Sequence, residues 1–182
     1  KTNCFGYLPC LWYAQVPEGL RKGPAFAYVQ DDPKLPRALL IGDSISIGYT
    51  PEVRSLLLRQ VNVHRVPDNA QNTTFTLASI DKWLGDKKWD VIHCNWGLHD
   101  LTSRGPDVQQ YVKNLKILID KLRATGATVV FATTTPIPED SAGRDPGSEL
   151  PYNKIALEVM TANHVLVNDL YSFALPKRKE IQ

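Results

Sequence analysis

The chain has 182 residues, 43% of them hydrophobic and 22% charged, and a formal net charge of +2. This length supports one domain with a hydrophobic core and is short for two. The small net charge gives no reason to expect nucleic acid or an anionic membrane surface as a partner. No apolar run approaches the roughly 20 residues that cross a bilayer, so no membrane span is expected.

From residue 37 onward, short apolar segments rich in Val and Ile alternate with amphipathic ones. The expected strands cover 37–42, 61–66, 90–96, 127–134 and 164–169. The expected helices cover 51–60, 76–85, 107–126 and 151–163, with Thr50 as a cap before the first of them. Such alternation favours a parallel sheet with right-handed crossovers. We therefore predict a three-layer α/β/α sandwich with a flavodoxin-like, five-stranded parallel sheet.

The pattern divides the chain into two parts. Residues 1–36 are rich in proline and aromatic side chains and do not fit the repeat, so we expect them to form an N-terminal arm that packs over the domain. Residues 37–182 form the α/β domain itself. The first ten residues lack the charged-then-apolar order of a signal peptide, and any such segment is expected to have been removed already.

Three cysteines permit at most one internal disulfide. Cys4 and Cys10 are close enough in sequence to pair, although a reduced pair is an equal alternative. A bridge would indicate an oxidising compartment, so a secreted or periplasmic location is expected, with the cytoplasm as the alternative. Cys94 lies in an apolar strand pattern and is expected to be a buried, inert thiol. No Cys, His and acidic cluster has metal-site spacing, and we expect no metal and no cofactor.

The unusual residues follow the expected strands, where open α/β sheets bind their ligands. Gly42, Asp43 and Ser44 follow the first strand, residues 68–74 the second, and residues 95–102 the third. A serine hydroxyl becomes a nucleophile only when a base takes its proton and donors stabilise the oxyanion. Ser44 is therefore either a nucleophile with a free backbone N–H, or a turn residue that caps the segment after it.

Three sequence blocks carry a resemblance to a known family. "IGDSISIGYT" resembles the first block of the SGNH (GDSL-type) hydrolases, "NAQNTT" is similar to the second, and "WDVIHCNWGLHDLT" to the third. The resemblance extends over roughly residues 37–182. It implies the SGNH hydrolase fold, Ser44 as the nucleophile, and an oxyanion hole formed by Ser44, Gln71 and His99.

Two of these positions depart from the family pattern. Gln71 stands where the second block usually has glycine, and a positive φ is costly for any other residue. His99 replaces the asparagine of the third block. Its imidazole can donate to an oxyanion but titrates near neutral pH, so His99 is an oxyanion donor, a substitute base or a structural residue.

Several neighbouring residues are candidates for supporting or substrate-binding roles: Asp43, Asn69, Asn72, Trp96, Gly97 and Asp100. Asn69 and Asn72 either orient their loop or bind substrate, or are ordinary turn residues. Trp96, together with loop 136–140, either forms an acyl or sugar wall or simply packs inside the protein.

The family's last block, Asp-x-x-His, supplies the general base and the aspartate that orients it. This block is absent from the sequence, because the histidines stand only at positions 64, 93, 99 and 164. His64 and His93 are expected to be structural strand residues, and His164 lies at the wrong end of its strand. Asp169 is followed three residues later by Ser172 and is expected to cap a turn.

The missing partners of Ser44 are therefore expected beyond Gln182, the last residue of the sequence. We expect the histidine base, its aspartate and a last helix to come from a further C-terminal fragment of the same protein. The 182 residues alone are expected to be weakly active and poorly stable.

The resemblance implies a serine ester hydrolase that removes short acyl groups, such as acetyl, from carbohydrate or small esters. The alternative is a catalytically inactive module that binds carbohydrate or protein. A nucleotide-binding domain is disfavoured, because the sequence has no Walker or G-x-G-x-x-G pattern.

Overall fold

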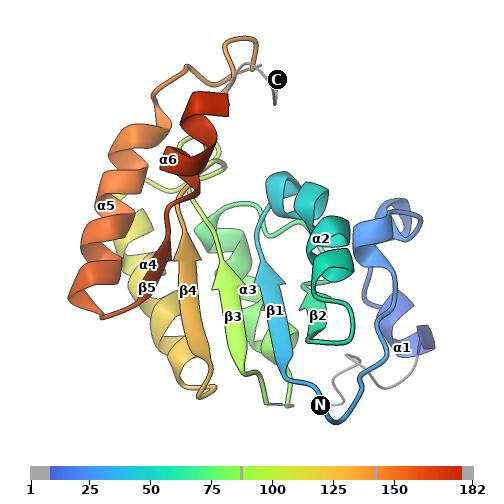
Figure 1. The fold of residues 1–182 in the computed structure, drawn as a ribbon. Coiled ribbons are helices and arrows are strands. Elements are labelled where there is room, and N and C mark those ends of the chain that lie inside the picture. Colours follow the sequence, from blue (N-terminus) through green and yellow to red (C-terminus); the bar gives the residue numbers. More distant parts are fainter. Residues whose placement is uncertain (1–8, 87, 142, 178–182) are drawn as a thin grey trace.

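The computed structural model describes residues 9–86, 88–141 and 143–177 (Figure 1). The strands are β1 (Arg37–Ile41), β2 (Asn62–Arg65), β3 (Val91–Cys94), β4 (Thr128–Ala132) and β5 (Leu166–Asn168). They form one parallel sheet in the order β2-β1-β3-β4-β5. From β1 the chain passes first to β2 on one side and then to β3 on the other side. The switch point of this topology therefore lies between the carboxyl ends of β1 and β3.

The helices complete a sandwich around the sheet. They are α1 (Pro9–Tyr13), α2 (Ser44–Leu56), α3 (Thr73–Leu84), α4 (Val108–Arg123), α5 (Glu149–Ala162) and α6 (Leu170–Ala174), with 3₁₀ turns η1 (Glu18–Leu20), η2 (Pro24–Phe26) and η3 (Leu175–Lys177). Helix α4 packs between α3 and α5 on one face, while α2 contacts β1 and β2 on the other (Figure 1). The predicted three-layer α/β/α fold is confirmed.

The main core lies between the sheet and α4. Leu39, Ile92 and Phe131 project from three neighbouring strands toward this helix and are fully buried. Apolar side chains of α4 recur at three- and four-residue steps, and five of them are fully buried: Tyr111, Leu115, Leu118, Ile119 and Leu122. This spacing places them along one face of the helix, as a helix packed on a sheet requires.

The opposite face of the sheet is covered only in part. His93 alternates with the core-facing residues of β3, and its ring packs edge-on against Tyr49 of α2. Toward β5 the cover ends, and Leu166, which lies on the same face as His93, remains 58% exposed. Within the described residues, only α6 and η3 follow β5.

The prediction that the base and its aspartate lie beyond Gln182 is not tested by this fold. The described residues end at Lys177, and Gln182 lies outside them. The origin of these two catalytic partners therefore stays a prediction.

Residues 9–36 lie against the β2 edge of the domain. Trp12 is buried and donates its indole N–H to the carbonyl of Phe26 at 2.7 Å. Asp31 reaches back to Nε2 of His64 at 2.6 Å. Cys4 lies outside the described residues, so its pairing with Cys10 is not tested. Cys94 is fully buried as predicted, and burial raises the pKa of its thiol.

Two helix starts were predicted wrongly. Helix α2 begins at Ser44 and continues through Pro51, which costs the helix one N–H donor but does not end it. Thr50 is therefore no cap: it is fully buried and donates its hydroxyl to the carbonyl of Ser46 at 2.6 Å. Helix α3 begins three residues earlier than predicted, because Asn72 caps it by accepting from the N–H of Phe75.

Candidate active site

Ser44 occupies the first position of α2, directly after β1. Asp43 is the N-cap of this helix and accepts a hydrogen bond from the N–H of Ile45 at 2.9 Å. Ser44 is exposed, and neither its hydroxyl nor its backbone N–H has a hydrogen-bond partner among the described residues. The N-terminus of a helix favours negative charge, so an oxyanion near this N–H would be stabilised. The turn thus presents a free hydroxyl and a free donor together.

A close approach of the chain fixes the shape of this turn. A Cβ atom on Gly42 would lie 2.9 Å from Cβ of Ser46, which is nearer than real side chains pack. Ser46 is itself buried and donates its hydroxyl to the carbonyl of Asp43 at 2.7 Å. Glycine at position 42 is therefore required by packing around the serine turn.

His99 lies beside the residue that precedes Ser44. Its Nε2 is 3.8 Å from Oδ2 of Asp43, which is an ion-pair distance but too long for a hydrogen bond. Burial lowers the pKa of His99 below its usual 6.5, and the charge of Arg144 lowers it further, while Asp43 acts in the opposite direction. Burial also raises the pKa of Asp43. At neutral pH His99 is thus a neutral imidazole, with one N–H donor and one acceptor nitrogen.

Gln71 adopts the backbone conformation that a glycine would favour. Its φ is +47°, in the left-handed region that the sequence analysis marked as costly for a glutamine. Its backbone N–H donates to the side-chain oxygen of Asn69 at 2.9 Å. In this structure the predicted oxyanion donor is therefore occupied by Asn69, and a substrate oxyanion has to displace that contact.

Asp100 joins the loop after β3 to the start of α3. It is fully buried, and its Oδ1 accepts from the backbone N–H and the hydroxyl of Thr73 at 2.8 and 2.6 Å. Gly97 has a φ of +150°, and a Cβ there would lie 2.6 Å from the hydroxyl of Thr134. Both residues support the loops that carry Gln71 and His99, and neither is placed to contact a substrate itself.

Asp100 should make the stability of the protein depend on pH. Burial raises its pKa to about 6 from the usual 3.8, and its Oδ2 is buried without a hydrogen-bond partner. Because the folded state binds this proton more tightly than the unfolded state, stability falls as the pH rises from about 4 through 6. The full effect is on the order of 3 kcal/mol.

An Asp100→Asn variant tests this expectation, since its amide oxygen still accepts from Thr73 but does not titrate. Chemical unfolding of both proteins between pH 4 and pH 8 should show the extra loss in the parent protein alone. Other groups, including Asp43, contribute to both curves and cancel in the difference between them. Parallel curves over the whole range would contradict the assignment.

Trp96 does not form a substrate wall. Its side chain is 1% exposed and donates its indole N–H to the hydroxyl of Thr76 at 2.9 Å, so the packing alternative holds. Asn72 serves as the cap of α3, as described above. Asp169 accepts from the N–H of Ser172, which confirms its predicted role as a cap.

The remaining histidines lie away from Ser44 as predicted. His64 is buried and bonded to Asp31, and His93 contacts the side chain of Asn168 at 3.2 Å. His164 lies in the turn before β5, with a φ of +52°. Among the described residues, His99 is therefore the imidazole that the fold brings to the Ser44 turn.

Arg65, at the end of β2, is a supporting residue that the sequence analysis missed. It is fully buried, and one of its terminal nitrogens donates to the carbonyl of Gly42 at 3.1 Å and to the hydroxyl of Ser46 at 2.9 Å. The other donates to the carbonyls of Val66 and Asp68. The guanidinium thus ties the serine turn to the loop that carries Gln71. A cation near the carboxyl end of an expected strand, "VNVHRV", was the available signal.

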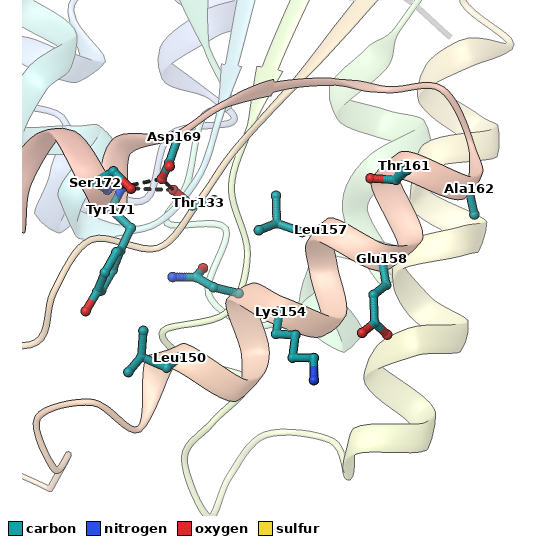
Figure 2. A pocket seen from close by; sticks show the side chains of 11 residues that line it. Thr133, Leu150, Lys154, Leu157, Glu158, Thr161, Ala162, Asp169, Tyr171 and Ser172 are labelled. Atoms are coloured by element: carbon teal, nitrogen blue, oxygen red, sulfur yellow. Dashed lines mark hydrogen bonds between the residues drawn. The ribbon is translucent and has the colours of Figure 1, made fainter.

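A hollow lies between α5 and the segment that follows β5 (Figure 2). It has a volume of about 700 Å³ and is lined by α5 and by the segment around Asp169 and Tyr171. Leu150 and Leu157 of α5 point into it and are 47% and 36% exposed. The residues that line this hollow include no His or Cys, so it brings no candidate nucleophile and imidazole base together.

The described residues form neither a metal site nor a membrane span. Within the described ranges, no group of three or more His, Cys, Asp or Glu side chains is arranged to hold a metal ion. No helix there is both long enough and apolar enough to cross a membrane.

Comparison with known proteins gives a clear structural likeness. No family model matches the sequence, and no curated protein matches it. Among solved structures, the acetyl xylan esterase AlAXEase is similar with a TM-score of 0.68 and 19% identity, over 79% of this chain and 84% of that one.

Two other solved structures are similar over comparable lengths. A lipase/acylhydrolase from Enterococcus faecalis gives a TM-score of 0.64 and 21% identity, covering 77% of this chain and 78% of the other. An acetylxylan esterase from Geobacillus stearothermophilus gives 0.60 and 15%, covering 75% and 77%. At these identities the likeness establishes a shared fold.

Proposed function

We propose that this chain, whose fold is that of the SGNH hydrolases, is part of a serine ester hydrolase that uses Ser44 as its nucleophile. The Ser44 oxygen adds to the ester carbonyl carbon while its proton passes to a base. The tetrahedral intermediate then expels the alcohol, which takes up that proton. Water hydrolyses the acyl-serine by the same two steps, releasing a carboxylic acid and regenerating Ser44.

The exposed, unpartnered Ser44 at the first turn of α2 carries this proposal. The developing oxyanion would be held by the N–H of Ser44, the N–H of Gln71 and the imidazole of His99. For Gln71 this requires the Asn69 side chain to release its hydrogen bond. His99 suits the donor role because burial lowers its pKa, which favours the neutral imidazole with its N–H donor at neutral pH.

The general base is proposed to be a histidine from beyond Gln182, in a further C-terminal fragment of the same protein, as the family resemblance implies. His99 is the alternative, since it stands 3.8 Å from a carboxylate in the residue next to Ser44. A neutral imidazole beside a carboxylate is the arrangement that a general base needs. Variants of His99 described in the Discussion separate the two roles.

Short acyl esters, above all acetyl esters on carbohydrate, are the proposed substrates. Two of the similar structures are named acetyl xylan esterases, which supports this class. A secreted or periplasmic location would give the protein access to polymeric carbohydrate. The competing proposal is a catalytically inactive module that binds carbohydrate or protein. Such a module would have the same fold as an esterase and would differ from it in having an unreactive Ser44.

A fluorophosphonate probe distinguishes an esterase from a binding module. In the full natural chain, Ser44 should displace fluoride from phosphorus and gain a phosphonyl group that mass spectrometry can locate. The expected result is one label per chain on the peptide that contains Ser44, and no label after Ser44→Ala. A folded protein that stays unlabelled, or labels equally in both forms, would favour the binding module.

A further inference from the structure

A polar groove of about 520 Å³ opens beside the proposed oxyanion groups. Gln71 and Asn72 line it from the loop after β2, His99 and Arg104 from the loop after β3, and Arg144 from the loop after β4. The groove is therefore lined by Gln71 and His99, the two residues assigned to the oxyanion besides Ser44, and by residues of three loops. An acetyl group fills only a small part of this volume, so the space is available to the alcohol part of an ester.

The charge of this groove is positive. Two arginines line it, and none of its described lining residues is acidic. Arg104 is exposed, and its guanidinium has no ion-pair or hydrogen-bond partner among the described residues. Asp43, whose Oδ2 lies 3.8 Å from Nε2 of His99, is 3% exposed and does not line the groove.

Arg144 is anchored through its Nε, and its two terminal guanidinium nitrogens face no hydrogen-bond partner among the described residues. Its Nε donates to the carbonyl of Leu98 at 3.0 Å, which anchors the guanidinium on the loop after β3. Its two terminal nitrogens make no hydrogen bond to the described part of the chain. The planar fork of an arginine fits the paired oxygens of a carboxylate or a sulfate, and an anchored fork loses less freedom on binding.

We propose that the groove binds an anionic group on the alcohol part of the ester, so that the substrate is an acylated acidic carbohydrate carrying a carboxylate or a sulfate. The substrate class rests on the proposed function, whereas the binding of the anion does not. The reaction is unchanged: water is consumed, and a carboxylic acid and an acidic sugar alcohol are released.

Binding of matched monosaccharides tests the groove without requiring turnover. The probes are methyl α-glucuronoside, methyl α-glucoside 6-sulfate and neutral methyl α-glucoside, titrated into the Ser44→Ala form of the full natural chain and followed by NMR. We expect one or both anionic probes to bind about tenfold more tightly than the neutral one at low salt. Which anion is preferred identifies carboxylate or sulfate as the natural group.

Variants of the arginines locate the effect. Arg144→Gln and Arg104→Gln together should bring the anionic probes to within about twofold of the neutral probe. Arg59→Gln is the control. Arg59 is exposed in the turn after α2, at the opposite end of the sheet from the groove. Arg59→Gln lowers the net charge by one, as Arg104→Gln and Arg144→Gln each do. Equal binding of all three probes, or a preference that survives the double variant, overturns the proposal.

A turnover measurement keeps this proposal separate from the proposed function. The substrate pair is 3-acetoxybenzoate and 3-acetoxybenzamide, which differ only in the charge on the leaving group. Faster hydrolysis of the acid, lost in the double variant, supports both proposals. If neither ester is hydrolysed while the anionic sugars still bind preferentially, anion binding stands and the hydrolase proposal fails.

Discussion

Replacing Ser44 with alanine is expected to reduce hydrolysis of p-nitrophenyl acetate by the full natural chain on the order of 10⁴-fold or more. The variant removes the only atom that forms a covalent bond to the acyl group in the proposed mechanism. The fold should be unaffected, because Ser44 is exposed and its hydroxyl makes no hydrogen bond to the described residues. Steady-state kinetics of purified protein, with the mass of each sample verified, provide the measurement.

A control substitution lies in the same helix. Ser55 is also exposed, near the other end of α2, so Ser55→Ala should keep the parent rate. Unfolding midpoints of the two variants should both match that of the parent protein. A Ser44→Ala enzyme that retains more than a few per cent of the parent turnover would rule out Ser44 as the nucleophile.

The same assay separates the roles of His99. If His99 donates to the oxyanion, His99→Asn should preserve most of the rate, because an amide N–H can replace the imidazole, and His99→Ala should lose about 10²–10³-fold. If His99 is the base, both variants should fall to the level of Ser44→Ala. As a base it must be unprotonated, so the parent rate would then decline as the pH falls through its pKa, which lies below 6.5.

The layers of the fold were predictable because they follow from local patterns. The five segments predicted as strands are all strands of one parallel sheet. In 108–123, the apolar residues at three- and four-residue steps form the buried face of a helix. The start of α2 was not predictable from the same rules. Pro51 usually marks the start of a helix, and only the capping contact between Asp43 and Ile45 shows that the helix begins seven residues earlier.

The positions of the candidate residues in the fold were predictable, but their contacts were not. The family-like blocks pointed to Ser44, Gln71 and His99, and the structure has these residues after the carboxyl ends of three strands. The hydrogen bond from Gln71 to Asn69 and the burial of Trp96 depend on how separate loops meet, and no sequence spacing encodes that. For the same reason nothing in the sequence pointed to Arg144.

Substitution of Arg65 by lysine is the second change expected to have a large effect. Arg65 is fully buried, and burial lowers the pKa of its guanidinium to about 10. It has four hydrogen-bond acceptors, two in the serine turn and two in the loop after β2, and its carbon Cζ lies 4.7 Å from the centre of the Phe26 ring. A lysine keeps the charge but cannot reach both segments with one planar group.

We therefore expect Arg65→Lys to cost about 2–5 kcal/mol of unfolding free energy, because buried acceptors in the two segments lose their hydrogen-bond donor. Below its melting temperature, the folded variant should also show a lower kcat, because the serine turn and the Gln71 loop lose their common anchor. Arg54→Lys is the matched control: Arg54 is partly buried, and it bonds to the carbonyls of Val63 and Pro24 rather than to either loop.

Urea unfolding and kinetics at a temperature where both variants are folded separate stability from positioning. If Arg65 acts only through stability, the two variants should lose stability and still turn over ester at the same rate per folded molecule. If it also positions the site, only Arg65→Lys should lose kcat. That difference would show that a side chain which touches no substrate sets the relation between the nucleophile and its oxyanion donors.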